Sequence, residues 1–395
     1  MNVLYYHGAF PKISESFVLN EIYELEQRGH NVSVCALNRP STNINHDEFD
    51  ELDIAVNYVP RPQYHHVTEL ISPRILRSCV LSKTWYRSPV RVHAANLFRA
   101  KRCIEFVDSI DFDVDHVHTH FASASRFGAR FVASYFQVPF TITTHAKDLY
   151  RKPVGEYTST LLQSAQRVIT ISEYNERHIR EEFIDDTPID VVRAGIRPEK
   201  FVPTDETVPN RVFTVCRFVE KKGVEYALKA VKRALEAVPD LEYHLVGSGE
   251  REDELRALTH ELEIEDAVTF LSNVSDSRLL DELDRAQCFL LPCVIAESGD
   301  RDGIPVALME AMVMKTPPVS TAVSGIPELI DHERNGLLVE PKQPQQTADA
   351  LVSILTDDET RETYGERARK TVVGRFNITK EVDKLESSFE KAANN

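Results

Sequence analysis

Features that mark membrane-spanning and exported proteins are missing from this sequence. No apolar run approaches the roughly 18 residues that cross a bilayer. The N-terminus, residues 1–7, is typical of a short strand and has neither the basic leader nor the cleavage site of a signal peptide. We therefore expect a cytoplasmic protein.

Paired cysteines are missing as well. Six cysteines stand apart at positions 35, 79, 103, 216, 288 and 293, and no Cys-x-x-Cys pair or Cys/His cluster has the spacing of a zinc site. This pattern predicts buried thiols in a reducing compartment.

The chain also has little positive charge. It carries 46 Lys and Arg residues against 62 Asp and Glu, a net charge of −16. Because nucleic-acid binding rests on neutralising phosphates, we expect no nucleic-acid partner. The acidic balance also fits a protein from a salt-rich cytoplasm, although many ordinary proteins are equally acidic.

What remains is the composition of a globular α/β protein. Apolar residues make up 42% and charged residues 27%, and a chain of 395 residues exceeds what one hydrophobic core supports. Short apolar runs alternate with helical patterns such as Phe17–Arg28 and Ser125–Phe136, which predicts parallel, doubly wound sheets. The first series of expected strands is Val3–Tyr6, Val32–Leu37, Val114–His118, Phe140–Thr144, Val168–Ser172 and Ile189–Val192. The second is Val212–Val215, Tyr243–Val246, Val268–Leu271, Phe289–Leu291, Pro318–Ser320 and Leu337–Val339.

The most informative segment runs from Asp302 to Glu310, two carboxylates with seven residues between them. It follows a buried-type strand at residues 288–292 and a polar loop at residues 296–301. Strand, loop and helix in this order place ligands at the carboxyl ends of strands in α/β proteins. Asp302 would stand at the mouth of such a site, and Glu310, about two helical turns further on, would reach a sugar hydroxyl.

The residues between the two carboxylates predict a helix start. Gly303 allows a turn, and Pro305 fits the first helical turn, where its missing N–H is no loss. The free amides of Val306 and Ala307 would then face the loop and favour an anion such as a diphosphate.

This segment resembles the motif of the retaining glycosyltransferase family 4, which has the GT-B fold. The family's pattern is Glu-x7-Glu, and here Asp302, one methylene shorter, stands at the first position. Further segments match the family in order and approximate spacing, namely residues 215–223, 245–249, 324–328 and 335–339. The resemblance covers nearly the whole chain.

The resemblance implies an α/β architecture of two Rossmann-like doubly wound domains facing a central cleft. Residues 1–196 would form the acceptor-side domain and residues 210–375 the donor-binding domain. The polar, proline-containing residues 197–209 would link them, and a last helix over residues 376–392 would cross back onto the first domain.

The function implied is that of a hexosyltransferase. It would move a sugar from a UDP- or GDP-linked donor to a glycan or lipid-linked acceptor in surface-polysaccharide or glycoconjugate synthesis. The sugar would keep its anomeric configuration, and the nucleotide sugar would be a cosubstrate, with no cofactor or metal. The opening loop, residues 7–17, resembles the subgroup that makes exopolysaccharides of the colanic-acid type.

In the second domain, family members place the first carboxylate by the donor sugar and the second on the ribose. Arg217 and Lys222 would neutralise the departing diphosphate, while Lys221 is a weaker candidate. Gly247 and Gly249 would allow close backbone approach to the donor. Glu328 is either a helix-start acid or a donor-site residue.

In the first domain, the family keeps a histidine at the position of His145, near the reacting sugar. Gly8 would form the turn nearest the donor phosphates, whereas Ser14, Glu15 and His120 would face the acceptor.

Two histidines of the first domain raise the question of a metal site. His118 and His120 lie on one strand face, as a metal pair would, but no third ligand is evident in the sequence. We predict no metal.

Two alternatives within the same fold remain open. The chain would be either a sugar-nucleotide epimerase or an inactive partner subunit, the latter hinted at by Asp302. A glycosidase is disfavoured, because Asp302 and Glu310 would lie about 12 Å apart on a helix with a rise of about 1.5 Å per residue, further than its paired carboxylates.

One basic segment stands out in this acidic chain. Residues 61–102 carry nine Lys or Arg and a single acid, Glu69, with the only tryptophan, Trp85, beside Tyr86. Basic residues and interfacial aromatics on an amphipathic helix are typical of proteins that lie on an anionic bilayer, which would make this one peripheral on the inner face of the plasma membrane. The alternative is a helical insertion whose charges pair with acids elsewhere.

Overall fold

The structure, a computed structural model, describes residues 1–12, 15–40, 49, 51–60, 90–155, 157–184, 186–204, 206–272 and 274–394. The chain forms two compact units. Unit 1 comprises Met1–Gly195 with Ile378–Asn395, and unit 2 comprises Ile196–Asn377. Much of the basic segment, residues 61–89, and Ser14 lie outside the described residues.

Unit 1 is built on a seven-stranded parallel sheet in the order β3-β2-β1-β4-β5-β6-β7. The strands are β1 (Asn2–Ala9), β2 (Asn31–Asn38), β3 (Ala55–Tyr58), β4 (His116–His120), β5 (Phe140–Thr144), β6 (Arg167–Thr170) and β7 (Ile189–Val191). The helices are α1 (Ser16–Gln27), α4 (Val90–Ser109), α5 (Phe127–Phe136), α6 (Ala146–Tyr150), α7 (Thr158–Leu162), α8 (Glu173–Glu182) and α16 (Ile378–Ala393).

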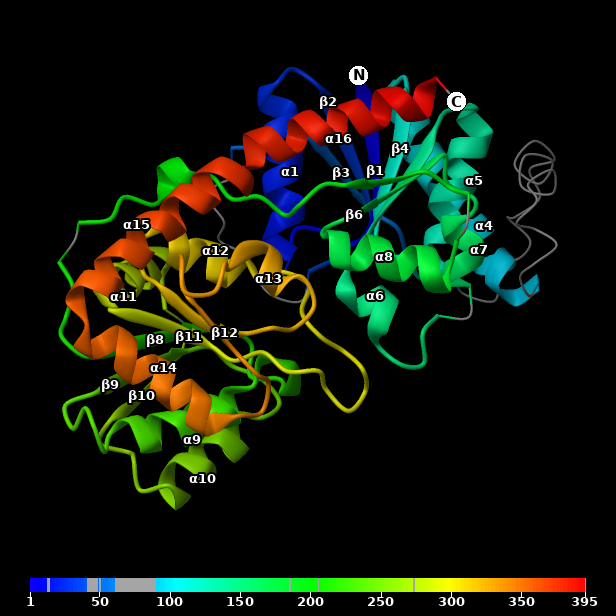
Figure 1. The fold of residues 1–395 in the computed structure, drawn as a ribbon. Coiled ribbons are helices and arrows are strands. Elements are labelled where there is room, and N and C mark those ends of the chain that lie inside the picture. Colours follow the sequence, from blue (N-terminus) through cyan, green and yellow to red (C-terminus); the bar gives the residue numbers. More distant parts are fainter. Residues whose placement is uncertain are drawn as a thin grey trace. The chain divides into compact units, whose positions relative to one another are not determined.

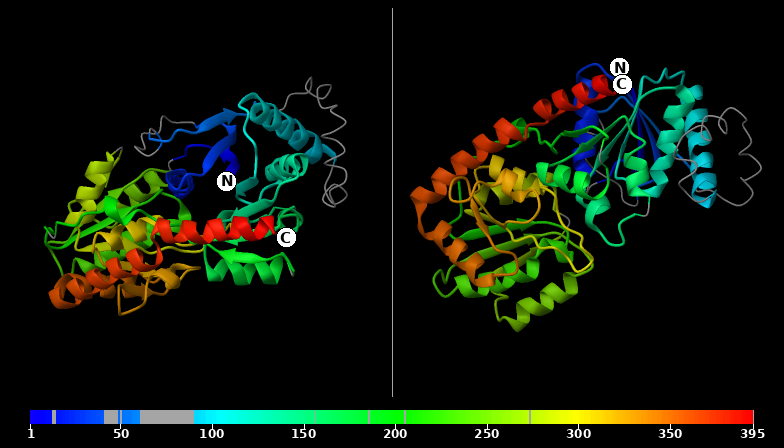
Figure 2. Two further views of the ribbon diagram at one scale, coloured as in Figure 1. Left: turned by 90° about the horizontal axis from the view of Figure 1, so that it is seen from above. Right: turned by 45° about the vertical axis from the view of Figure 1, so that its right-hand side comes forward.

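Alternation along β1 divides the core of unit 1 between the two faces of its sheet. Val3 and Tyr5 pack with the apolar stripes of α1 and α16, whereas Leu4 and Tyr6 pack with α4 and α5. Figure 1 shows α16 lying beside α1, and both views of Figure 2 keep this helix along the sheet.

Ion pairs fix α16 in this position. Arg28, at the end of α1, donates to Asp383 and Glu386, each at 2.7 Å. The Glu386 carboxylate also accepts from His30 at 2.6 Å, and Phe389 stacks near His116 with ring centroids 4.2 Å apart. The last helix of the chain therefore completes unit 1.

Unit 2 repeats the plan with six parallel strands in the order β10-β9-β8-β11-β12-β13. The strands are β8 (Arg211–Val215), β9 (Glu242–Val246), β10 (Val268–Leu271), β11 (Cys288–Leu291), β12 (Pro318–Thr321) and β13 (Leu337–Val339). The helices are α9 (Val224–Ala234), α10 (Glu252–Glu261), α11 (Asp276–Arg285), α12 (Val306–Val313), α13 (Ile326–Leu329), α14 (Pro344–Thr356) and α15 (Asp358–Arg375). One apolar cluster joins α9, α10 and α14, and another joins α11, α12 and α15.

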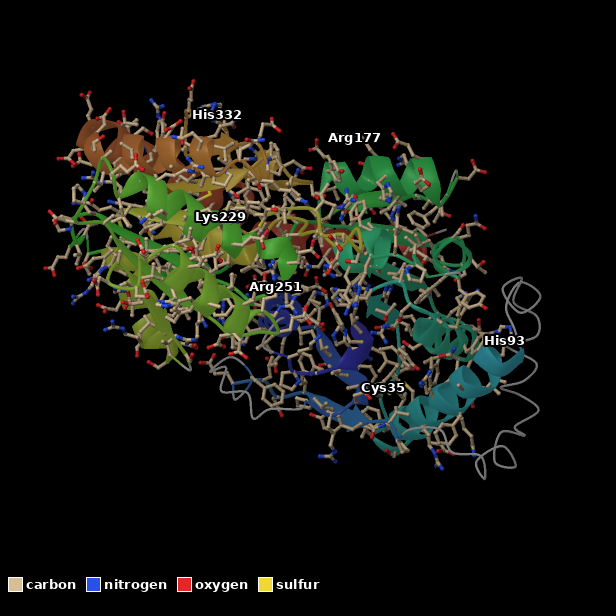
Figure 3. All side chains as sticks on the ribbon, turned by 90° about the horizontal axis from the view of Figure 1, so that it is seen from below. Cys35, His93, Arg177, Lys229, Arg251 and His332 are labelled. Atoms are coloured by element: carbon tan, nitrogen blue, oxygen red, sulfur yellow. The ribbon has the colours of Figure 1, made fainter. Side chains whose placement is uncertain are left out.

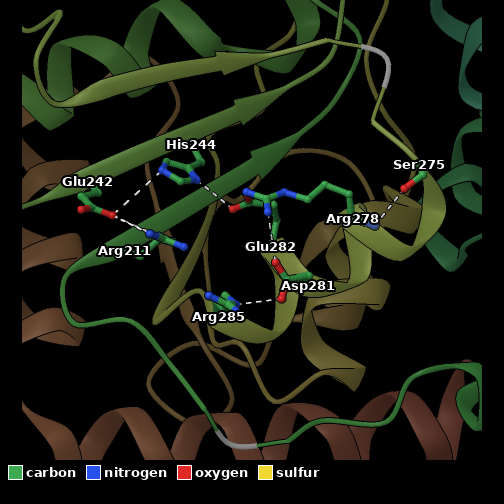
Figure 4. A network of polar contacts seen from close by, with 8 residues as sticks. All are labelled: Arg211, Glu242, His244, Ser275, Arg278, Asp281, Glu282 and Arg285. Atoms are coloured by element: carbon green, nitrogen blue, oxygen red, sulfur yellow. Dashed lines mark hydrogen bonds and ion pairs between the residues drawn. The ribbon is translucent and has the colours of Figure 1, made fainter.

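A buried carboxylate anchors α11 to the sheet of unit 2, as Figure 4 shows. Glu282 is fully buried and accepts from His244 on β9 at 2.8 Å and from Arg278 one turn earlier. Ser275 caps this helix by accepting from the Arg278 amide at 3.2 Å. These contacts hold the first turn of α11, which bears Asp276, in one place.

The predicted α/β strand series is confirmed, with shifts at some ends. The strand expected at Val114–His118 runs instead over His116–His120, because the pairing with β5 continues to the second histidine. The short strand β3 was not predicted, since its four half-buried residues lie in a polar surrounding.

Residues 197–209, expected as a linker, belong to unit 2. Phe201 is buried in its core, and the Thr204 amide donates to Asp284 at 2.9 Å. The prolines interrupt periodicity here, but the segment is anchored by these contacts.

Candidate active site

The predicted donor-site residues gather where the sheet of unit 2 reverses its winding. β8 and β11 are neighbours in the sheet. The chain leads from β8 to β9 on one side and from β11 to β12 on the other. Loops after two such strands leave an opening at the carboxyl edge, the usual ligand position in open α/β sheets. The loop after β8 carries Arg217 and Lys222, and the loop after β11 carries Asp302.

An ion pair connects these two loops. Lys222 Nζ lies 2.7 Å from Asp302 Oδ2, and both side chains are largely buried, 12% and 13% exposed. Burial opposes the charges, but the partners outweigh it: the pKa of Asp302 falls to about 2 and that of Lys222 rises above its usual value. Both groups are therefore ionised at neutral pH, and Lys222 is less exposed than its predicted role required.

Lys221, the weaker candidate, makes more contacts than the sequence indicated. Its Nζ lies 3.2 Å from Asp300 and 3.4 Å from Asp302, and it donates to the Arg301 carbonyl at 3.4 Å. The short 3-10 turn Glu220–Lys222 directs both lysines at one acidic loop. The Lys-Lys pair was a signal for this arrangement, although the sequence did not show that both side chains would be buried.

Close backbone packing explains why residues 247 and 249 are glycines. A Cβ on Gly247 would meet the Cys216 carbonyl oxygen at 1.9 Å, and one on Gly249 would meet the Phe218 carbonyl oxygen at 2.4 Å. The two glycines therefore let the loop after β9 pack against the loop that carries Arg217. They shape the site through its backbone.

The start of α12 differs by one residue from the prediction. Pro305 is the N-cap, with φ −63° and ψ 127°, and the helix begins at Val306. The Leu308 amide donates to the Pro305 carbonyl at 3.1 Å, so the amides of Val306 and Ala307 precede the first helical hydrogen bond. Gly303 is buried in the loop that leads into this turn.

Glu310 lies on the same helix, half-buried and without an ion-pair partner among the described residues. Burial, with a smaller contribution from the negative charge of Asp276, raises its pKa to about 7. Without an ion-pair partner among the described residues, the Glu310 carboxylate oxygens can accept hydrogen bonds from a ribose diol.

Two candidates of unit 2 remain, Arg217 in the loop after β8 and Glu328 after β12. Arg217 is exposed and makes no ion pair with a described residue. Glu328 is half-buried in the first turn of α13, where its amide donates to the Gly325 carbonyl at 2.9 Å.

In unit 1, His145 and His120 come together at the ends of neighbouring strands. His145 caps α6: its side chain accepts from the Asp148 amide, and Asp148 accepts from the His145 amide at 2.8 Å. Its Nε2 lies 3.1 Å from His120 Nδ1, and His120 Nε2 lies 3.1 Å from Glu21 Oε1.

The Glu21 carboxylate sets the direction of this chain of hydrogen bonds. An ionised carboxylate only accepts, so His120 Nε2 carries the proton and His120 Nδ1 accepts from His145 Nε2. Burial also lowers the pKa of His145 well below its usual value. Both ring nitrogens of a neutral His145 are therefore engaged within unit 1, and Glu21, on α1, is a member of the site that the sequence analysis missed.

Glu15 and Gly8 lie near this chain. His7 Nε2 and Glu15 Oε2 are 2.9 Å apart. Burial works to raise the pKa of Glu15, but the hydrogen bond with His7 and the charge of Lys12 lower it to about 2. A Cβ on Gly8 would meet Arg126 Nη2 at 2.7 Å, so glycine there lets a guanidinium approach the backbone of β1.

A third donor atom for the histidine pair appears only in the structure. Ligand atoms of Glu21, His118 and His120 all lie within 4.8 Å of one another. Hydrogen bonds already reach these atoms, since Tyr5 donates to Glu21 at 2.6 Å and His118 Nε2 lies 3.1 Å from Thr143 Oγ1. That no metal is needed stays a prediction.

Comparison with known proteins identifies the class. The profile described as Glycosyltransferase Family 4 matches residues 14–200, and that described as Glycosyl transferases group 1 matches residues 196–371. The chain therefore belongs to the family 4 glycosyltransferases, and the predicted enzyme class is confirmed.

Relatives cover nearly the whole chain. A glycosyltransferase named for colanic acid biosynthesis, WcaL of Escherichia coli, is 29% identical over 95% of this chain and 96% of its own. The amylovoran biosynthesis glycosyltransferase AmsK of Erwinia amylovora is 29% identical over 90% of each chain.

A solved structure supports the fold. HepE of Anabaena, in complex with UDP and glucose, is 16% identical and aligns over 99% of each chain with a TM-score of 0.74. The predicted GT-B fold of two Rossmann-like units is confirmed. No helix among the described residues combines the length and apolar character needed to cross a bilayer.

The raised pKa of Glu310 predicts a pH-dependent stability. Its pKa is about 7 in the folded chain against 4.5 unperturbed, so the folded state binds more protons between these values and loses stability as pH rises through them. Glu310→Gln should therefore melt a few degrees higher than wild type at pH 8, with the gap closing by pH 4. Differential scanning calorimetry measures this, and the exposed Glu340→Gln serves as the control. A constant gap across pH would contradict the assignment.

Proposed function

We propose that the chain transfers a hexosyl group from a nucleoside-diphosphate sugar to a glycan or lipid-linked acceptor during surface-polysaccharide synthesis. The sugar keeps its anomeric configuration. UDP or GDP is the carrier, and neither a cofactor nor a metal takes part.

The observation that carries this proposal is the pairing of two unlike groups on α12. The N-terminal amides of Val306 and Ala307 and the nearby Lys222 favour a diphosphate, while Glu310 further along the helix accepts from hydroxyls. A diphosphate joined to a ribose presents these two chemistries in this order.

The relatives support the proposal. AmsK and WcaL are named for the synthesis of amylovoran and colanic acid. HepE was solved with UDP and glucose.

The proposed reaction breaks the bond between the anomeric carbon and the diphosphate oxygen. Arg217, Lys222 and the α12 amides stabilise the charge on the departing diphosphate. The acceptor hydroxyl attacks from the same face, and its proton passes to the leaving phosphate oxygen. No protein nucleophile is required.

The other candidates hold groups in place. Asp302 keeps Lys222 charged and oriented, and Gly247, Gly249 and Gly303 shape the donor loops. Glu328, after β12, is assigned to the donor sugar.

Of the candidates in unit 1, Gly8 and His145 are assigned to the donor, and Ser14, Glu15 and His120 are assigned to the acceptor. With both ring nitrogens of His145 engaged, we assign it a positioning role rather than proton transfer.

A nucleotide-binding screen tests the proposal. UDP or GDP should raise the melting temperature of wild type, since a ligand that binds only the folded state stabilises it. Glu310→Gln should bind the nucleotide at least about tenfold more weakly, because a hydrogen bond to a charged group contributes roughly 1.5–3 kcal/mol. Calorimetric affinities equal to wild type would remove Glu310 from the ribose site.

The same panel of nucleotide sugars separates the alternatives. A transferase releases UDP or GDP in the presence of an acceptor, whereas an inactive partner subunit releases none above background. An epimerase converts the donor sugar without any acceptor.

Substitution of the cations tests leaving-group stabilisation. Arg217→Ala should lower turnover by at least about 10²-fold, in line with the loss of one transition-state charge contact. Its exposed side chain leaves the fold unaffected. Lys222→Ala should do the same but also lower the melting temperature, because Asp302 loses its partner. Lys229→Ala, on α9 and labelled in Figure 3, is the control and should turn over normally. Near-normal rates in both test variants would rule them out of the mechanism.

We also propose that residues 61–102 bind an anionic membrane surface. Within the described part of this segment, Lys101 and Arg102 pair with Glu105 on α4, at 3.4 and 2.9 Å. The proposed membrane contact is therefore assigned to basic residues other than these two.

Liposome co-sedimentation tests this contact. Wild type should bind anionic vesicles at low salt and be released at high salt, since each basic residue near the surface adds about 1 kcal/mol. Changing Arg74, Arg77 and Lys83 to Glu should abolish binding, whereas Lys101→Glu should change it little. If wild type stays in the supernatant at low salt, the acceptor is not reached through this segment.

A further inference from the structure

A cavity lies in unit 1. Of the described residues assigned so far to the donor or the acceptor, only Gly8 lines it. Its volume is about 500 Å³, and among the described residues it is lined by Gly8, Leu37, Asn38, Pro60, Arg99, Ser125 and Arg126. These residues come from the carboxyl ends of β1 and β2, from α4 and from the 3-10 turn Ala124–Arg126 before α5. The lining holds two guanidinium groups and no carboxylate.

Arg126 is the central feature of this cavity. Its side chain is 6% exposed, and it donates from Nε to the His120 carbonyl at 2.9 Å and from Nη1 to Ser125 Oγ at 3.0 Å. Its Nη2 faces the Gly8 backbone. The carboxylates of Glu15 and Asp148 act on Arg126 electrostatically, but no carboxylate among the described residues forms an ion pair with it. A buried guanidinium is costly without a counter-charge.

Arg99 adds a second cation beside the first. It is half-buried on α4, and its one hydrogen bond among the described residues, to Asn96 Oδ1, is long at 3.5 Å. The two guanidiniums are close enough that Arg99, after burial itself, helps to lower the pKa of Arg126. Two adjacent cations that face a cavity with no acid among its described lining residues favour an external anion there.

The volume of the cavity and its other lining groups limit the class of ligand that fits it. A cavity of about 500 Å³ is far larger than one phosphate needs and lies in the range of small-molecule pockets. Asn38 and Ser125 offer an amide and a hydroxyl, which are suited to ring hydroxyls. Two forked guanidiniums suit a planar carboxylate or a phosphate.

We propose that this pocket binds an acidic sugar of the acceptor, a pyranose that carries a carboxylate or a phosphate. The proposal deepens the proposed function by assigning a charge class to the acceptor, and it rests on that function. The competing source of the anion is the diphosphate of the donor, because Gly8 was expected near it.

Binding to the full-length protein tests the pocket without any turnover. The probes are glucuronic acid, glucose 6-phosphate and neutral glucose, titrated by ligand-observed NMR at low salt. Both acidic probes should bind and glucose should not. Arg99→Gln and Arg126→Gln should each weaken the acidic probes at least tenfold, and Arg126→Lys should restore only part of the loss, since lysine keeps the charge but not the fork.

The matched control is Arg177→Gln, an exposed arginine on α8 in the same unit, labelled in Figure 3. This variant removes one positive charge at a position outside the pocket, so it should bind both acidic probes like wild type. Because Arg126 supports the fold through the His120 carbonyl, Arg99→Gln is the decisive variant if Arg126→Gln melts early.

Three results would overturn the proposal: no acidic probe binds folded wild type, Arg177→Gln weakens binding as much as Arg99→Gln, or Arg99→Gln weakens UDP and GDP as much as the acidic sugars. The last result would assign the anion to the donor. If the acidic probes bind but no nucleoside diphosphate is released, the proposed function is wrong and the pocket assignment stands. If a nucleoside diphosphate is released but no probe binds, the pocket assignment is wrong and the proposed function stands.

Discussion

A reversal of winding in each parallel sheet is the constraint on which the chemistry of this protein depends. In unit 1 the chain turns from β1 outward to β3 and then returns to β4, and in unit 2 it does the same at β8 and β11. Loops that follow two such neighbouring strands separate and leave their carboxyl ends open. The Lys222–Asp302 pair and the α12 amides follow β8 and β11. In unit 1, the His120–His145 contact and the cavity beside Gly8 lie at the carboxyl ends of β1, β2, β4 and β5. These side chains lie at the carboxyl edges of the sheets because the separated loops leave space there.

The treatment of buried charge then separates structural from ligand-binding groups. Lys222 with Asp302, and Glu282 with His244 and Arg278, are charges whose burial is offset by partners in the same unit. Glu310 is half-buried and Arg126 is 6% exposed, and no described residue forms an ion pair with either. Such groups destabilise a fold unless a ligand compensates them. Their opposite signs assign them to different partners, hydroxyls for Glu310 and an acid for Arg126.

Much of this could be predicted from the sequence, for identifiable reasons. Buried parallel strands are short apolar runs, so all the strands except β3 were found, and a motif that joins a strand end to a helix start drew attention to Asp302 and Glu310. Exposure was harder to predict, since only the turn Glu220–Lys222 directs both adjacent lysines toward one acidic loop and buries both side chains. Glu21 was missed because it lies about a hundred residues before His120. The Arg99–Arg126 pocket was missed for the same reason: Arg99 belongs to the basic segment 61–102, Arg126 does not, and only tertiary packing joins them.

The hydrogen-bond chain of unit 1 bears on the kind of catalysis the protein performs. His145 accepts from the Asp148 amide and donates to His120, which donates to Glu21, so a proton taken up by His145 would break the helix cap or reverse two imidazole tautomers. Burial adds to this cost, because it lowers the pKa of His145 well below the physiological range. A rigid, neutral histidine is poorly suited to general acid–base chemistry and well suited to shaping a sugar site. Proton transfer directly from the acceptor to the departing diphosphate, stabilised by the cations of unit 2, needs no such base. The neutral hydrogen-bond chain of unit 1 therefore agrees with the proposed reaction, in which the leaving group takes up the proton.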